Sequence, residues 1–352
     1  MVIHRSNLVL APPLYGLEAG YVISTRKSLL ADGYTPALLK KGVRDGDLVR
    51  LRRGVYEQRT PPASNPEAQH RRQIVASTLL SGYVVSHASA VVLHGLPIGD
   101  ADIREVHVSR LGPGRGGDRH RAGRQVHVAR LEPEFCTTVD GIPVTTVARS
   151  LVDLARTAGR RTAVSAGDAA LHGELCTTED LTQALEVVRG RPGADQARWS
   201  LALCDGRSES PGETWTRLLL REAGLPSTDL QISIFDESGR FVGCADGGIP
   251  QWGVLWEYDG VAKYDTLLKS GQTTLDAVLA EKRREGGFVE LGWLVIRVIN
   301  TDLRPPDHLV RRFHEAVART RRPGWQPPRG SFRIASPSGP ARTTLRAPAQ
   351  PV

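Results

Sequence analysis

Residues 24–56 read STRKSLLADGYTPALLKKGVRDGDLVRLRRGVY, and this stretch decides how the first part of the chain folds. Two helical patterns are separated by Gly33, and an alternating segment follows them. Thr35 can cap the second helix, and Pro36 suits its first position, where an amide hydrogen would have no partner in any case. Gly46 ends that helix. The stretch therefore predicts a helix, a turn, a second helix and a basic β-ribbon.

The basic side chains follow these predicted elements. Leu38, Leu39 and Val43 supply the apolar side of the second helix, which leaves its basic residues mostly outward. In the ribbon, arginines alternate with Val49 and Leu51, so that they can lie beside phosphates. This layout is typical of a winged helix-turn-helix module, whose second helix enters the major groove of double-stranded DNA. A small helical cap on the next domain is the other interpretation. The predicted DNA contacts are Lys40, Lys41, Arg44, Arg50, Arg52 and Arg53.

Length and composition limit the class of protein. A chain of 352 residues, 40% hydrophobic and 24% charged, suits two or three globular domains. Its four cysteines lie far apart without a CxxC pair, which indicates neither a disulfide framework nor a zinc site. No apolar run approaches the roughly 20 residues of a membrane helix. We expect a cytoplasmic protein with no membrane partner.

The net charge of +8 is concentrated at the two ends of the chain. Residues 1–60 hold ten Lys/Arg against five Asp/Glu, and residues 319–352 hold seven Arg and no acid. A basic end is typical of nucleic-acid-binding proteins, although a solvated surface has the same composition. The last segment is rich in Pro, Ser, Gly and Arg and cannot bury much apolar surface. We therefore predict that residues 321–352 form a disordered tail.

Three stretches resemble the AbiEi family of antitoxins from type IV toxin–antitoxin systems. They are GYTPALLKKGVRDGDLVRLRRGVYE at 33–57, VVSHASAVVLHGLP at 84–97 and GIPVTTVARSLVDLA at 141–155. Together they cover about the first 160 residues in the order expected of the family. The resemblance implies an N-terminal module that binds DNA and represses its own operon. It also implies a functionally linked nucleotidyltransferase-like toxin.

Two similar arms, EVHVSR and QVHVAR, follow the second of these stretches and predict a pair of strands. His107 and His127 occupy equivalent places in the arms. With no third ligand identifiable nearby, packing or surface histidines are a better interpretation than metal ligands. His87 and His94 fall on one face of a predicted helix, where packing or capping is expected. Residues 145–196 have a helical pattern.

The last part of the chain predicts a compact α/β arrangement of helix, three strands, helix, strand and helix. Ser210 and Glu213 form the capping box of its first helix. A hairpin at residues 229–246 delivers Asp246, and the strand VLWEYDG carries Glu257 and Asp259 at alternate positions, on one face. These acids would suit a divalent cation such as Mg²⁺, which prefers oxygen ligands and would relieve their repulsion. A surface-facing strand end and a satisfied helix cap would explain them as well.

Residues 210–297 resemble the PD-(D/E)XK nuclease superfamily, in a branch similar to the very-short-patch-repair (Vsr) endonucleases. The shared pattern is SPGE, an Asp, ExDG with a basic residue soon after, a charged helix, and GW followed by apolar residues and Arg. The resemblance implies a metal held by Asp246 and Asp259. It further implies Glu213 and Glu257 as supporting acids and Lys263 at the scissile phosphate.

The same region departs from the superfamily in three places. Asp246 is followed by Gly247 and Gly248, which weaken a strand. Gly286 and Gly287 are predicted to interrupt the charged helix. The usual ExK is ExD here. A fold retained for binding while its chemistry decays would have this pattern.

We therefore predict an α/β (α+β) multidomain protein. Its predicted parts are a winged helix-turn-helix domain at 1–60, a mixed AbiEi-like middle domain at 61–205, a restriction-endonuclease-like α/β domain at 206–320 and a tail at 321–352. The predicted function is a DNA-binding transcriptional regulator of the AbiEi antitoxin type. The alternative is a Mg²⁺-dependent DNA endonuclease of the PD-(D/E)XK, Vsr-like class. A protein–protein adaptor is a third hypothesis.

Overall fold

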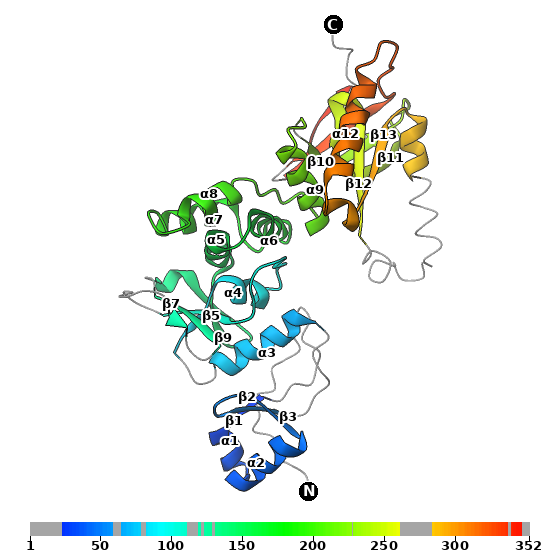
Figure 1. The fold of residues 1–352 in the computed structure, drawn as a ribbon. Coiled ribbons are helices and arrows are strands. Elements are labelled where there is room, and N and C mark those ends of the chain that lie inside the picture. The colour runs from blue at the N-terminus through cyan, green and yellow to red at the C-terminus, as the bar shows by residue number, and fades with distance from the viewer. Residues whose placement is uncertain are drawn as a thin grey trace. The chain divides into compact units, whose positions relative to one another are not determined.

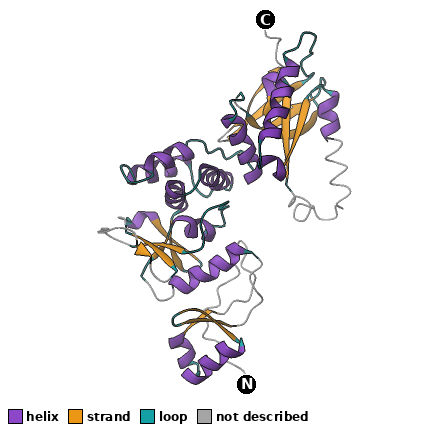
Figure 2. Ribbon diagram, viewed as in Figure 1, coloured by secondary structure: helices purple, strands orange, loops and turns teal. Residues whose placement is uncertain are grey.

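A computed structural model shows that the chain is an α+β multidomain protein, as predicted (Figure 1). It separates into two compact units: unit 1 is Met1–Ala166 with Leu175–Leu203, and unit 2 is Gly167–Glu174 with Cys204–Val352. Both units contain helices and strands (Figure 2). The structure describes residues 23–58, 65–78, 82–110, 119–120, 123–128, 131–226, 228–260, 284–336 and 339–346.

The N-terminal module of unit 1 is a helix pair with a three-stranded antiparallel sheet of order β1-β3-β2. Helix α2 begins with Thr35 as its cap and Pro36 at its first position, and it ends at Gly46, whose φ of 80° is left-handed. These predicted signals are confirmed. The elements are β1 (Ile23–Thr25), α1 (Arg26–Ala31), α2 (Pro36–Asp45), β2 (Leu48–Arg52) and β3 (Val55–Gln58), around a core of Leu29, Leu39, Leu48 and Tyr56.

The middle of unit 1 is a six-stranded mixed sheet of order β6-β7-β5-β4-β9-β8. The two predicted arms become β5 and β7, which pair in parallel with His107 opposite Gln125. β4 pairs in parallel with β9, so the second and third AbiEi-like stretches lie side by side. The strands are β4 (Val84–Val85), β5 (Val106–Ser109), β6 (Arg119–His120), β7 (Arg124–His127), β8 (Cys136–Val139) and β9 (Ile142–Thr145).

Helices accompany this sheet and continue the chain toward unit 2. The helical pattern predicted for residues 145–196 is confirmed, and the last of its helices, α8, starts at Ala194. Gln196 on α8 donates to the carbonyl oxygens of Ala155 and Ala158, so this helix belongs to unit 1. The helices are α3 (Pro66–Thr78), α4 (His87–Leu93), α5 (Val147–Thr157), α6 (Arg160–His172), α7 (Thr178–Val187) and α8 (Ala194–Leu201).

Unit 2 is built on a second six-stranded sheet, of order β13-β12-β11-β10-β14-β15. Only β12 and β13 are parallel to each other within it. In the part of the chain that the structure describes, no helix combines the length and the apolar character needed to cross a membrane. The elements are α9 (Pro211–Glu222), β10 (Asp229–Phe235), β11 (Phe241–Ile249), β12 (Val254–Asp259), a helix at residues 284–290, β13 (Leu294–Ile299), α12 (Asp307–Thr320), β14 (Ser331–Ser336) and β15 (Gly339–Arg346).

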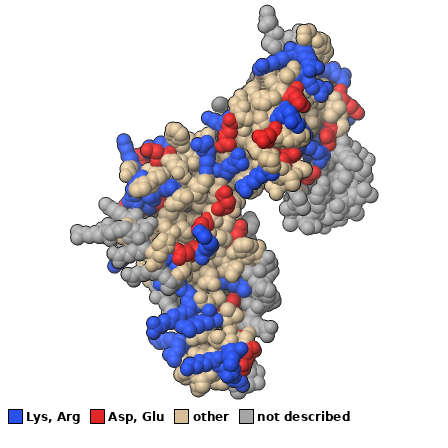
Figure 3. All heavy atoms as spheres, in the orientation of Figure 1, with Lys and Arg blue, Asp and Glu red and all other residues tan. Residues whose placement is uncertain are grey.

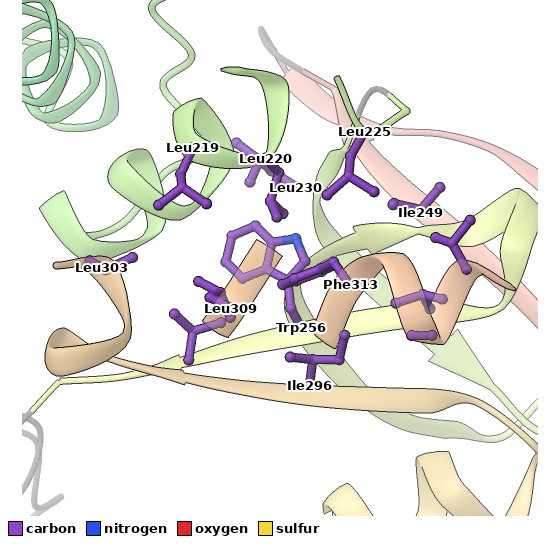
Figure 4. Close-up of a cluster of buried hydrophobic side chains, with 14 residues drawn as sticks. Leu219, Leu220, Leu225, Leu230, Ile249, Trp256, Ile296, Leu303, Leu309 and Phe313 are labelled. Carbon is purple, nitrogen blue, oxygen red and sulfur yellow. The ribbon is translucent and has the colours of Figure 1, made fainter. Parts of the chain in front are cut away.

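The main core of unit 2 surrounds Trp256, which is fully buried between the sheet and helices α9 and α12 (Figure 4). This ring explains the glycines after Asp246. A Cβ on Gly247 would lie 2.3 Å from the Trp256 ring, and one on Gly248 would lie 2.5 Å from the Val254 carbonyl oxygen. Strand β11 continues to Ile249, so the glycines permit close packing here.

Two predictions about unit 2 are wrong. Gly286 and Gly287 do not interrupt the helix, since residues 284–290 are continuously helical. Residues 331–336 are not a disordered tail but strand β14, which pairs with β10 and buries Phe332 in a second core cluster. Composition alone missed this strand because its alternating SFRIAS is short and lies among prolines and arginines. Residues 347–352 lie outside the described residues.

Candidate nucleic-acid interface and acidic cluster

The basic face of the N-terminal module consists of Lys40, Lys41 and Arg44 on α2 together with Arg50 and Arg53 of the β2–β3 ribbon. All five side chains are exposed. Figure 3 shows Lys and Arg gathered over this module. Leu39 turns inward to the module's core, which leaves the cations of α2 on its solvent-exposed sides.

An open hollow of about 690 Å³ lies between α2 and the ribbon. Lys40 and Val43 of the helix line it, as do Arg50 and Arg53 of the ribbon and Tyr56 at its floor. Cations on both walls of a hollow favour an anionic partner. The helix and the ribbon therefore share one positively charged hollow.

Arg52, the sixth predicted DNA contact, points elsewhere. Its guanidinium donates to Ser77 Oγ on α3, and burial together with the nearby Arg124 lowers its pKa. Arg52 therefore does not belong to the basic face, because the bulge between Arg50 and Arg52 in β2 shifts the alternation that the sequence suggested.

Glu213 is the first member of the acidic cluster of unit 2. Its side chain, 2% exposed, accepts hydrogen bonds from the Glu209 amide at 2.9 Å and the Ser210 hydroxyl at 2.8 Å. Gly212 has no Cβ to collide with the Tyr258 ring, so the start of α9 approaches β12 closely. Burial, and then the charge of Asp246, raise the pKa of Glu213 to about 7. Glu213 is therefore mostly protonated below about pH 7.

Asp246 and Glu257 lie next to each other across β11 and β12. Gly247 pairs with Trp256, and extending this register by one residue places Asp246 opposite Glu257. Asp246 accepts a hydrogen bond of 2.7 Å from the Tyr258 amide. Glu257 is buried and ion-paired with Arg284 at 3.2 Å. Burial raises the pKa of Glu257, and Arg284 opposes that rise.

Asp259 has different neighbours from those predicted. Its carboxylate lies 3.2 Å from Arg297 on β13, and Arg297 also bonds Glu285 at 2.9 Å. Asp246 thus lies near both Glu213 and Glu257. Asp259 is instead ion-paired with Arg297, which also binds Glu285. Lys263 lies outside the described residues.

The nuclease resemblance implies a Mg²⁺ ion, for which Glu213, Asp246, Glu257 and Asp259 are the candidate oxygen donors. Hard carboxylates suit the ion, and neither buried oxygen of Glu257 has a hydrogen-bond partner among the described residues. However, Arg284 already neutralises Glu257, and Glu213 keeps its proton to about pH 7. Within the described ranges, no three His, Cys, Asp or Glu side chains are placed to hold a metal. The described residues do not fit a metal centre.

Unit 1 contains a cluster of histidines whose full extent the sequence did not reveal. The rings of His87 and His127 stack with centroids 3.5 Å apart, and His107 Nδ1 lies 3.0 Å from His127 Nε2. His70, which no motif in the sequence marks, lies 2.8 Å from Ser89 Oγ through its Nε2. Burial lowers the pKa of His70 and of His107 to about 4. His70 and His107 are therefore neutral at pH 7, and the stacked rings of the cluster pack against one another.

The other two histidine predictions have separate outcomes. His94 ends α4, and its Nε2 lies 2.7 Å from the Thr145 carbonyl oxygen, which is a capping and packing role. His87 adopts a φ of 53°, in the left-handed region that is uncommon for a non-glycine residue. The ring of His87 lies beside those of His107 on β5 and His127 on β7, a contact that no helical pattern could have predicted.

Comparison with known proteins gives relatives but no activity. No protein-family profile matches the chain. Two proteins of Mycobacterium tuberculosis, from strains CDC 1551 / Oshkosh and ATCC 25618 / H37Rv and each described as uncharacterized, are 29% identical to it over 287 residues. The match covers 80% of this chain and 97% of each relative. Because neither unit alone has that many residues, the similarity extends over both units.

Proposed function

We propose that this chain is a DNA-binding transcriptional regulator of the AbiEi antitoxin type. The proposal rests on one observation: Lys40 of the second helix and Arg50 and Arg53 of the ribbon line one open hollow, and Lys41 and Arg44 are exposed on the same helix. A recognition helix beside an Arg-bearing wing suits the major groove and its flanking phosphates. The proposal implies a cytoplasmic protein that represses its own operon.

The middle domain supports the same proposal. The two further AbiEi-like stretches form β4 with α4 and β9 with α5. They are paired through Val85 and Val144 and tied by the bond from His94 to Thr145. If the chain had the middle domain of that family, these two stretches would be expected to lie together in one sheet, as they do. In this proposal the chain counters a nucleotidyltransferase-like toxin, and that effect need not involve direct contact.

The test is a binding titration of the full chain with DNA from upstream of its own gene. Removing Lys40 and Arg44 together, as Lys40→Ala with Arg44→Ala, is expected to weaken binding at least tenfold. The reason is that each charge-assisted hydrogen bond contributes about 1.5–3 kcal/mol. The dependence of log K on log[salt] should also become shallower by roughly one for each lost phosphate contact.

A matched control removes two cations of unit 1 outside the basic face, as Arg189→Ala with Arg198→Ala. Both arginines are exposed and both pair with Glu186. This control should bind DNA like the wild type. Equal affinities for the wild type and the Lys40/Arg44 variant would contradict the placement of the recognition helix.

The toxin part of the proposal has its own test. A nucleotidyltransferase-like protein encoded next to this chain is expressed alone and then together with it. Arrest of growth that co-expression relieves would support the antitoxin assignment. If co-expression does not relieve the arrest of growth although the chain binds DNA, the chain is a regulator and not an antitoxin.

A DNA endonuclease is the second candidate, favoured by the gathering of Glu213, Asp246 and Glu257 on unit 2. Its test is the nicking of supercoiled plasmid with Mg²⁺ or Mn²⁺, with EDTA and the variant Asp246→Asn as controls. Nicking that both controls abolish would support the endonuclease. Intact plasmid that is nevertheless retarded in a gel would reject it.

A further inference from the structure

The first turn of α2 exposes apolar side chains beside the basic face. Ala37 is exposed, and Leu38 has 49% of its surface exposed. Val43 on the same helix and Val49 on β2 are 38% and 45% exposed. Three large apolar side chains are thus exposed on one small module, which favours a contact surface.

The same turn offers little for hydrogen bonding. Pro36 has no amide hydrogen, and the Leu38 amide is already donated to Thr35 Oγ1 at 3.2 Å. The side chains of Pro36, Ala37 and Leu38 carry no polar atom. If the start of a recognition helix meets base edges, this one can recognise them chiefly through apolar contact.

Only one apolar group belongs to the base edges of the major groove, the C5 methyl of thymine. We propose that Ala37 and Leu38 contact thymine methyl groups, while Lys40, Lys41 and Arg44, one to two turns further on, hold the flanking phosphates or guanine. This inference rests on the proposed function and deepens it, because it names the chemical group of DNA that the N-terminal module recognises. The surrounding cations favour duplex DNA as the occupant of this apolar surface.

Replacing thymine by uracil removes the methyl group alone and therefore tests the inference. The upstream fragment is prepared with dTTP or with dUTP, and the full chain is titrated with each. Binding to the uracil fragment should be roughly fourfold weaker for each methyl contacted, the equivalent of about 0.8 kcal/mol. In the variant Leu38→Ser, the difference between the two fragments should shrink.

Two controls separate this inference from the proposed function. Leu175→Ser removes another half-exposed leucine of unit 1, at 50% exposure, and should keep the full difference between the fragments. Lys40→Ala with Arg44→Ala should weaken binding to both fragments equally. The shrinkage in Leu38→Ser assigns the effect to this side chain rather than to altered DNA shape.

Equal affinity for both fragments, with steep salt dependence retained, would overturn thymine recognition and leave the regulator standing. Equal differences in the wild type and in Leu38→Ser would also overturn it. Failure to bind either fragment, with binding to vesicles of anionic lipid instead, would overturn both the inference and the proposed function.

Discussion

Glu213 should make unit 2 less stable as the pH rises through neutrality. Its pKa is about 7 in the folded chain and about 4.5 without the surrounding structure. The folded state therefore keeps a proton that the unfolded state releases between these values, and stability falls as pH rises from 4.5 to 7. A difference of 2.5 pKa units corresponds to about 3 kcal/mol of unfolding free energy.

The variant Glu213→Gln cannot ionise and resembles the protonated acid. It should be less dependent on pH than the wild type and should exceed it in stability by about 3 kcal/mol at pH 8. Urea unfolding at pH 5 and pH 8, followed by tryptophan fluorescence, measures this. Five of the six tryptophans belong to unit 2, and the other, Trp199, is already exposed.

The exposed Glu290 supplies the control, since Glu290→Gln removes a carboxylate of the same unit without changing a buried acid. Its stability should follow the wild type at both pH values. If Glu213→Gln and the wild type differed equally at pH 5 and pH 8, the reasoning from the buried proton would be refuted.

Three further predictions concern stability and packing. The pKa of His70 is about 4, against an ordinary 6.5. Its contribution to the unfolding free energy of unit 1 is therefore complete above pH 6.5, and about 3 kcal/mol is lost as the pH falls toward 4. Hydrogen exchange of the α4 amides at pH 7 and pH 4.5 measures this loss. Gly247→Ala should destabilise unit 2 by about 1–3 kcal/mol because its Cβ meets Trp256, whereas Gly286→Ala, helical and with open space around it, should be neutral or stabilising in the same urea titration. Arg52→Ala should lower the melting temperature of unit 1 through loss of the Ser77 contact, yet weaken DNA binding less than Lys40→Ala with Arg44→Ala, as calorimetry and gel retardation would show.

The features predicted correctly from the sequence have causes within a few residues. Thr35, Pro36 and Gly46 bound α2 through contacts inside its own first and last turns. Ser210 likewise caps α9 through its hydroxyl. Such signals can be recognised in a single sequence because capping and turn geometry depend on immediate neighbours. Glu213 does not complete the predicted capping box, because its carboxylate accepts from the Glu209 amide rather than from the Ser210 amide. Its burial beside Asp246 depends on packing between α9 and β12.

The features that the sequence missed depend on partners far along the chain. Arg52 meets Ser77, which lies 25 residues away, and Phe332 reaches the sheet core of unit 2 from a segment with the composition of a tail. His70 joins the histidine cluster through Ser89, 19 residues away. Periodicity predicts which side of an element is buried. It does not identify which element covers that side.

The repulsion expected between Glu257 and Asp259 is relieved without a metal ion. Each has its own arginine, Arg284 from the helix at 284–290 and Arg297 from β13, and both arginines lie 3.2 Å from their acids. Glu213 avoids repulsion from Asp246 by keeping a proton. A divalent ion would have to displace Arg284 from Glu257, Arg297 from Asp259 and the proton from Glu213 before it could bind these acids. These acids are thus paired or protonated in ways that serve the fold of unit 2, and under the proposed function DNA binding belongs to the exposed cations of the N-terminal module.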